Sequence, residues 1–274
     1  LHLSIRRQRQ MCIRDRREDN MEEFKAGKIN KYILNSKILE RDITLSIYLP
    51  EDFTELFKSQ VIICFDGLDF FRFGRIQREY ERLRKEEHIE RAIIVGFHYE
   101  DVEKRREEFH PQGSRSQKTI KSVVKELLPF IDQTFPTYKV GNSRLLIGDS
   151  LAGSIAFLTS LTYPSIFSQI AMFSPHSDHT VLEKFETCKQ RNRLTIWHAI
   201  GKDEVDFKLP TTGEQADFLT PNRKLSNLIE QDECVTYVYN EFNGSHNWKS
   251  WKPMIGDIPV SYTHLRAHET GRNL

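Results

Sequence analysis

Short apolar runs, most of them rich in β-branched residues, recur along the chain between longer segments whose apolar positions repeat every three or four residues. Most of these runs do not alternate with polar residues, which is typical of strands that are buried on both faces of a sheet. Strands are therefore predicted at residues 43–49, 61–65, 92–97, 144–148, 169–174, 194–201 and 234–242.

Helical patterns lie between the predicted strands. In the clearest one, from Ile120 to Ile131, apolar residues three and four positions apart form one continuous stripe. A later helix is expected to begin with Thr220 as its N-cap and Pro221 at its first helical position. The repeated order of strand and helix predicts a single α/β domain: a doubly wound, mostly parallel sheet with helices on both faces and the first strand or two antiparallel at an edge.

The two ends of the chain follow neither pattern. Residues 1–16 and 260–274 resemble translated sequencing-adapter sequence, so we exclude them and expect the domain itself to occupy residues 21–259. Together the two segments carry a net charge of +5, and the whole chain a formal +1, which leaves the remainder near −4. We therefore expect no nucleic-acid partner, although the chain starts with an Arg-rich segment.

Composition excludes several other classes of protein. A chain of 274 residues with 38% hydrophobic content can bury a sizeable core. No window reaches the roughly 18 uninterrupted apolar residues of a membrane span, and the N-terminus lacks the apolar region of a secretory signal. The four cysteines show no metal-ligand spacing and are too sparse for a disulfide framework. These features favour a soluble cytoplasmic protein without a membrane partner, and they leave homo-oligomerisation open.

The segment GDSLAG, residues 148–153, lies where a predicted strand ends and a helical pattern begins. Catalytic groups in a doubly wound sheet lie at the carboxyl ends of strands. Small residues two before and two after Ser150, Gly148 and Ala152, suit a sharp turn that lifts the serine hydroxyl clear of the sheet. Ser150 is therefore a candidate nucleophile, and the alternative is that it serves only as a helix N-cap.

A serine nucleophile requires a base and an acid, which are expected downstream in the order acid and then histidine. His246 lies in the loop after the last predicted strand and is the candidate base; otherwise it is a surface histidine that caps a helix. The acidic segment after Gly201 offers Glu204 as the first choice of acid, Asp203 as a close second and Asp206 as a third. A solvated acidic loop is the alternative there.

An oxyanion hole is the last requirement, because the charge that develops on the substrate oxygen must meet preorganised N–H donors. The backbone N–H of Leu151 would supply one donor. The second is expected from Leu68, with Asp69 as the alternative, in the loop after the strand at 61–65. The neighbouring Gly67 is otherwise an ordinary turn residue.

Five motifs occur in a fixed order: FDGLDFFRFGRI, RREEFHPQG, IGDSLAGSIAFL, FSPHSD and FNGSHNWKSWKP. Together they resemble the esterase family that includes esterase D and the enterobactin-esterase-like hydrolases, over residues 29–259. The resemblance implies a serine hydrolase of the α/β-hydrolase fold that cleaves carboxylic esters through an acyl-enzyme, with Ser150 as nucleophile, His246 as general base and no metal or other cofactor. The acid carries over less directly, since some relatives work with a serine and histidine pair. Two departures are Ala152, where many members have glycine, and the closing helix after the histidine, which we expect to be cut short.

The substrate is expected to be a small-molecule ester, with a siderophore ester as one option. Basic residues could steer an anionic ester, or they could be solvated surface; they are Arg72, Arg75, Lys104, Arg105, Arg106 and Arg115. The candidate substrate-binding residues are Asp69, Phe70, Arg106, His176 and Trp248. Two other functions stay open: acyl transfer to an acceptor other than water, and a catalytically inactive binding protein of the same fold.

Overall fold

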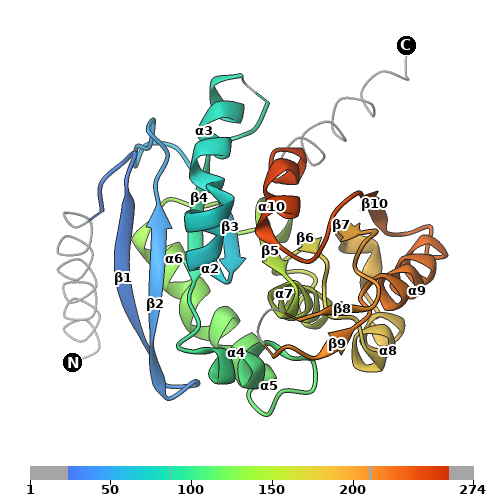
Figure 1. Cartoon of the computed structure of the whole chain (residues 1–274). Coiled ribbons are helices and arrows are strands. Elements are labelled where there is room, and N and C mark those ends of the chain that lie inside the picture. The colour runs from blue at the N-terminus through green and yellow to red at the C-terminus, as the bar shows by residue number, and fades with distance from the viewer. Residues whose placement is uncertain (1–23, 87, 210–211, 259–274) are drawn as a thin grey trace.

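An eight-stranded sheet forms the centre of the computed structural model, which describes residues 24–86, 88–209 and 212–258 (Figure 1). The strand order is β1-β2-β4-β3-β5-β6-β7-β10. β1 is antiparallel to β2 and β2 to β4, whereas all other neighbours are parallel. The predicted mostly parallel sheet with an antiparallel edge is therefore confirmed. Its strands are β1 (Ile29–Ser36), β2 (Arg41–Tyr48), β3 (Gln60–Phe65), β4 (Ala92–Phe97), β5 (Arg144–Asp149), β6 (Gln169–Phe173), β7 (Thr195–Gly201) and β10 (Thr236–Phe242).

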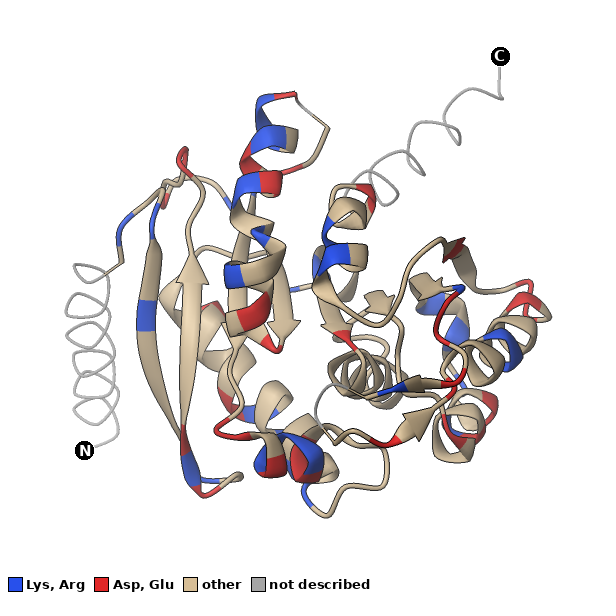
Figure 2. Cartoon of the chain, viewed as in Figure 1, with Lys and Arg blue, Asp and Glu red and all other residues tan. Residues whose placement is uncertain are grey.

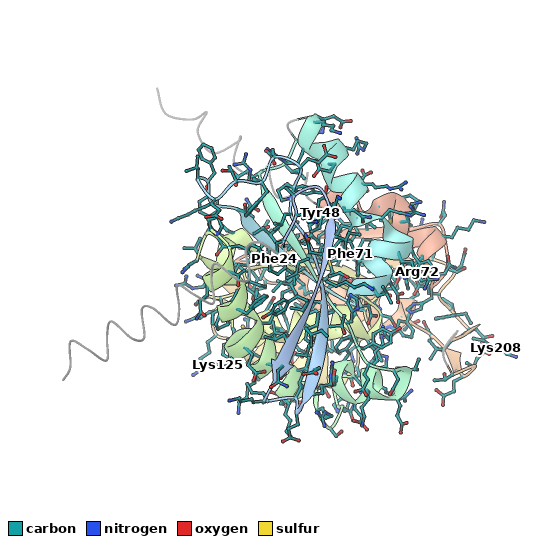
Figure 3. All side chains as sticks on the ribbon, turned by 90° about the vertical axis from the view of Figure 1, so that its left-hand side faces the viewer. Phe24, Tyr48, Phe71, Arg72, Lys125 and Lys208 are labelled. Atoms are coloured by element: carbon teal, nitrogen blue, oxygen red, sulfur yellow. The ribbon has the colours of Figure 1, made fainter. Side chains whose placement is uncertain are left out.

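Helices cover both faces of the sheet. One face packs against α2 (Gly67–Asp69), π-helical η1 (Phe70–Gly74), α3 (Ile76–Lys85), α10 (Trp248–Trp251) and 3-10 helix η5 (Lys252–Met254). The other packs against α4 (Val102–Phe109), α5 (Ser116–Ser122), π-helical η2 (Val123–Leu127), α6 (Leu128–Thr134), α7 (Leu151–Thr162), α8 (His179–Thr187) and α9 (Leu219–Glu230). Figure 3 views the sheet from its β1 edge, with Phe71 and Arg72 on one side and Lys125 on the other.

Strand β3 illustrates why the predicted strands lack polar alternation. Successive side chains of a strand point to opposite faces. Ile62 and Cys64 belong to one apolar cluster and Val61, Ile63 and Phe65 to the other, so neither face of β3 meets solvent.

The structure differs from the predicted elements at three places. Strand β1 and the small antiparallel pair β8 (Phe207–Lys208) and β9 (Gln215–Ala216) were not predicted. The helix predicted from the stripe at 120–131, by contrast, is confirmed, because these residues lie within continuous α5, η2 and α6. The N-cap prediction for Thr220 is wrong: α9 begins at Leu219, and the Thr220 N–H donates to the Asp217 carboxylate at 3.0 Å.

Charged residues of both signs are interspersed along helices such as α3 and α4 (Figure 2). None of the described helices combines the length and apolarity that a membrane span requires. The two adapter-like segments, 1–16 and 260–274, lie outside the described residues. Because β3, β4, β5, β6, β7 and β10 run parallel, the segments that follow them begin at one edge of the sheet, and the candidate site residues lie in these segments.

Candidate active site

Ser150 occupies a strained turn between β5 and α7. Its φ of 52° and ψ of −124° lie in a region that side-chain-bearing residues rarely adopt. Two backbone hydrogen bonds to neighbouring loops hold the turn: the Ser150 N–H donates to the Phe173 carbonyl at 2.9 Å, and its carbonyl accepts from the His176 N–H at 3.2 Å. Ser150 precedes the first residue of α7, yet its side chain makes no capping hydrogen bond within the described chain.

The contact between β5 and α7 depends on Gly148. A Cβ atom at this position would lie 2.1 Å from the Ala152 carbonyl oxygen, so only glycine lets the helix approach the strand this closely. Ala152 is fully buried at the same contact. The requirement for small residues around the serine therefore has a steric cause.

His246 and Glu204 form a buried pair. The His246 Nδ1 lies 2.7 Å from Glu204 Oε2, and the exposed fractions of the two residues are 7% and 0%. Glu204 Oε1 accepts from the Ser174 hydroxyl at 2.5 Å and from the Gly201 N–H at 3.0 Å. The Ser174 hydroxyl in turn accepts from the Trp251 Nε1–H at 3.0 Å. The carboxylate is therefore fixed from three sides, and Nε2 is the histidine nitrogen left for other partners.

Aromatic side chains hold the His246 ring on its other sides. Its centroid lies 4.5 Å from that of Phe218, 4.9 Å from Trp251 and 5.3 Å from Phe207. Phe207 belongs to the small β8–β9 pair, so this unpredicted element helps to orient the candidate base.

The other two candidate acids lie elsewhere. Asp203 and Asp206 are both exposed, and neither carboxylate bonds to His246 in the described part of the chain. The Asp206 carboxylate accepts instead from Gln215. Among the acids considered, the structure brings only Glu204 to the histidine.

A pocket of about 290 Å³ has Ser150 and His246 on its wall. The residues that line it are Asp66, Asp69, Tyr99, Val102, Arg105, Asp149, Ser150, Leu209, His246, Asn247, Trp248 and Trp251. The reactive hydroxyl and the candidate base thus open onto the same space.

Two of the five candidate substrate-binding residues, Asp69 and Trp248, line this pocket. Phe70 is buried against Trp248, with ring centroids 4.8 Å apart, and therefore supports the wall rather than forming it. Arg106 and His176 do not line the pocket as described: Arg106 is exposed, and the His176 ring packs on His110 and Phe218. Their role in substrate binding stays a prediction.

The two candidate oxyanion donors begin helices at the same edge of the sheet. Leu151 is the first residue of α7 and Leu68 the second of α2. The alternative donor, Asp69, already donates its N–H to the Asp66 carbonyl at 2.9 Å. Gly67 is more than a turn residue, because a Cβ there would lie 2.2 Å from Gly96 Cα. The close approach to β4 therefore fixes the start of α2.

Three further charged residues line the pocket: Asp66 and Asp149, which sequence reasoning missed, and Arg105, which it named only as a possible steering residue. Arg105 Nε lies 2.9 Å from both oxygens of Asp66, which follows β3 directly. Burial, and then the nearby Asp66 carboxylate, raise the pKa of Asp149 well above its ordinary value. Asp149 could have been found from its place next to the serine. Arg105, rather than Arg106, could have been found from its position four residues before buried Phe109 on the same helix face.

One group among the described residues could hold a metal ion: ligand atoms of His110, His176 and Asp178 lie within 4.8 Å of one another. Two of the three side chains also have a protein partner, since Gln112 donates its N–H to His110 Nδ1 and its side-chain amide to Asp178. That no metal is needed stays a prediction.

Comparison with known proteins identifies the family. A family model described as "Putative esterase" matches residues 36–259, most of the chain. The chain belongs to this esterase family. The uncharacterized protein YjcH of Bacillus subtilis (strain 168) is 41% identical to this esterase over 231 residues, which cover 84% of this chain and 95% of that protein.

Solved structures share the fold at lower identity. The enterobactin esterase FES from Shigella flexneri, in the presence of 2,3-di-hydroxy-N-benzoyl-glycine, has a TM-score of 0.70 and 17% identity, over 87% of this chain and 60% of that one. The BES protein from Bacillus cereus has a TM-score of 0.72 and 18% identity, over 88% of this chain and 97% of that one. The chain thus spans about 60% of the enterobactin esterase's length. The chain is thus a member of the esterase family and has the α/β-hydrolase fold.

Proposed function

We propose that Ser150, His246 and Glu204 form the catalytic triad of this esterase. The observation that carries the proposal is the buried Glu204–His246 pair in a pocket that also contains the serine of the strained turn. Asp203 is not part of it, because its side chain is exposed.

The proposed reaction runs in two steps. Ser150 Oγ attacks the ester carbonyl while His246 Nε2 takes its proton, and the same imidazolium then protonates the departing alcohol. Water, activated by His246, hydrolyses the acyl-enzyme and regenerates the serine. Glu204 holds the proton on Nδ1 and stabilises the imidazolium. The N–H groups of Leu151 and Leu68 stabilise the oxyanion of each tetrahedral intermediate.

Hydrolysis of p-nitrophenyl acetate and butyrate tests this assignment. We expect the Ser150→Ala chain to lose at least about 10³-fold in kcat, because the nucleophile cannot be replaced. Circular dichroism of both chains serves as the control for folding. A folded Ser150→Ala chain that keeps the parent's rate would overturn the triad.

The proposal extends to the cellular compartment. Cys64, Cys188 and Cys234 are free thiols, and Cys234 is exposed. An exposed thiol suits a reducing environment, which supports a cytoplasmic location.

A further inference from the structure

The pocket that holds Ser150 is lined by more acidic than basic side chains. Asp66, Asp69 and Asp149 are its carboxylates, and Arg105 is its one Lys or Arg among the described lining residues. Arg105 is already engaged by Asp66 through both carboxylate oxygens. Asp69 and Asp149 thus have no ion pair of their own within the described chain, and a bound cation would oppose the burial that raises the pKa of both carboxyls.

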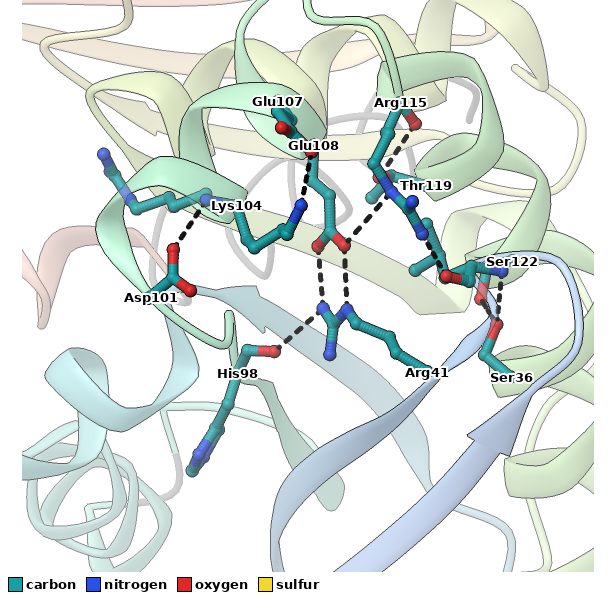
Figure 4. A network of polar contacts seen from close by, with 12 residues as sticks. Ser36, Arg41, His98, Asp101, Lys104, Glu107, Glu108, Arg115, Thr119 and Ser122 are labelled. Atoms are coloured by element: carbon teal, nitrogen blue, oxygen red, sulfur yellow. Dashed lines mark hydrogen bonds and ion pairs between the residues drawn. The ribbon is translucent and has the colours of Figure 1, made fainter.

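Arg105 is not free to turn toward the other two carboxylates. Its helix, α4, is tied to β2 through the fully buried Glu108, which accepts from Arg41 at 2.8 and 2.7 Å (Figure 4). The guanidinium itself lies 5.7 Å from the Tyr99 ring centroid and 6.0 Å from that of Phe109. Packing and pairing therefore keep Arg105 on Asp66.

Asp149 is the buried acidic group nearest in sequence to the nucleophile. Its residue is 6% exposed, it lines the pocket, and its Oδ1 has no hydrogen-bond partner among the described residues. A buried carboxyl oxygen without a partner costs free energy of desolvation that nothing in the protein offsets. A positively charged group of a ligand would supply the partner that Asp149 Oδ1 lacks among the described residues.

Aromatic side chains complete the same wall. Trp248 and Trp251 line the pocket, with ring centroids 5.7 Å apart. Indole faces attract cations, most strongly where water is excluded. Carboxylates and indoles together are a typical environment for an organic cation, whereas an anion would be repelled by the acidic groups.

We propose that the substrate is an ester whose alcohol or acyl part carries an ammonium or quaternary ammonium group, bound beside Asp149 and Asp69 while the ester carbonyl reaches Ser150. This inference rests on the proposed function, because it names the substrate class of the same site. It replaces the expectation that basic residues steer an anionic ester: of the six basic residues considered, only Arg105 lines the described pocket, and Arg105 is paired with Asp66.

Three acetate esters of similar size and different charge test the proposal on the full chain: acetylcholine, its neutral isostere 3,3-dimethylbutyl acetate, and anionic 2-acetoxyethanesulfonate. We expect kcat/KM for the cationic ester to exceed that for the neutral one by about tenfold, with the anionic ester slowest. Asp149→Asn and Asp69→Asn, which remove charge but keep shape, should each bring the cationic-to-neutral ratio toward one.

Glu103→Gln is the matched control. Glu103 is exposed on α4 and does not line the pocket, so its loss of one negative charge should leave the ratio unchanged. A parent ratio near one, a preference for the anionic ester, or equal loss of the ratio in Glu103→Gln would overturn the cation subsite.

A binding measurement tests the cation subsite independently of the catalytic triad, because it requires no ester hydrolysis. Choline and 3,3-dimethylbutanol are titrated into the full-length Ser150→Ala chain, with tryptophan fluorescence as the readout. Choline binding about tenfold tighter, and weakened in the double variant with Asp149→Asn, supports the subsite even if the parent hydrolyses no ester. Hydrolysis of the neutral ester without tighter choline binding supports the triad and rejects the subsite.

Discussion

At the scale of single residues, Glu204 is constrained by three donors that come from different loops. His246, Ser174 and the Gly201 backbone each occupy part of the carboxylate. A Cβ at Gly201 would lie 2.6 Å from Glu204 Oε1, so a glycine is what lets the backbone N–H reach it. The tautomer of His246 follows from this arrangement, because the carboxylate faces Nδ1 and favours the proton there.

The first prediction at this scale concerns the acid. Glu204→Gln should lower kcat by about 10³- to 10⁴-fold, because the amide can donate to Nδ1 and so favours the wrong tautomer. Asp203→Asn, one residue before Glu204 in the same loop, serves as the comparison and should keep the parent rate. Steady-state hydrolysis of p-nitrophenyl butyrate measures both. Loss of activity in Asp203→Asn alone would assign the acid to the other carboxylate.

The sequence could narrow the acid to a short segment but could not choose within it. Glu204, Asp203 and Asp206 have similar chemistry, and what separates them is burial and the contact to Ser174, which lies after a different strand. Ser150 and His246 were easier to select, since each follows a recognisable strand. Of the neighbouring Arg105 and Arg106, only Arg105 lines the described pocket, because the phase of α4 places it on the same face as buried Phe109.

At the scale of elements, the site depends on how closely β5 and α7 meet. The Gly148 backbone and the Ala152 carbonyl leave no room for a methyl group between them. Relief of such a clash requires the helix to move away from the strand, and the Ser150 hydroxyl and the Leu151 N–H would move with it.

Gly148→Ala should therefore reduce both activity and stability. A displacement of about 1 Å at a reacting group costs about 10²-fold in rate. Ala152→Gly, on the opposite side of the same contact, adds no atom and should cost only about 1 kcal/mol of stability for glycine in a helix. Thermal unfolding and kcat/KM distinguish the two variants. Equal behaviour of the pair would contradict a steric origin.

A buried histidine joins three further elements. His198 on β7 contacts the Tyr237 hydroxyl of β10 and the Asn222 Oδ1 of α9, each at 2.8 Å. Burial lowers the pKa of His198 to about 4 from the ordinary 6.5. Between these values the unfolded chain binds a proton that the folded chain does not.

The folded state should therefore lose stability as the pH falls from 6.5 toward 4, by about 1.4 kcal/mol per pH unit for this group. His198→Gln should show a shallower dependence of the unfolding free energy on pH. Urea unfolding at pH 7, 6 and 5 gives the slopes. Parallel slopes for parent and variant would show that His198 does not take part.

The elements that could be predicted were those with a single environment along their length. β3 and β5 are buried on both faces, so their sequences are uninterrupted apolar runs. Edge strand β1 alternates between exposed and half-buried positions, and β8 and β9 are two residues each. Such short or half-exposed strands are specified by their neighbours, which a local pattern does not contain.

At the scale of the whole molecule, all three apolar clusters of the described residues and every candidate site residue lie between Phe24 and Ile258. We propose that residues 21–259 are the folding unit. A chain limited to these residues should keep the parent's melting temperature and esterase activity, since it loses no contact of the described core. Calorimetry beside the full chain is the measurement. A markedly lower melting temperature would place a stabilising contact in the residues removed.

The hydrogen bond from Trp251 to Ser174, and from Ser174 to Glu204, has a consequence for the order in which the molecule is made. A ribosome completes the turn that holds Ser150 before it has produced the acid, and it produces His246 and Trp251 later still. From residue 150 until His246 has been made, the nascent chain therefore carries the serine without both of the side chains proposed to activate it. Under the proposed triad, activity requires that α10 has emerged and docked, so we expect hydrolysis to begin with the finished domain rather than with a growing one.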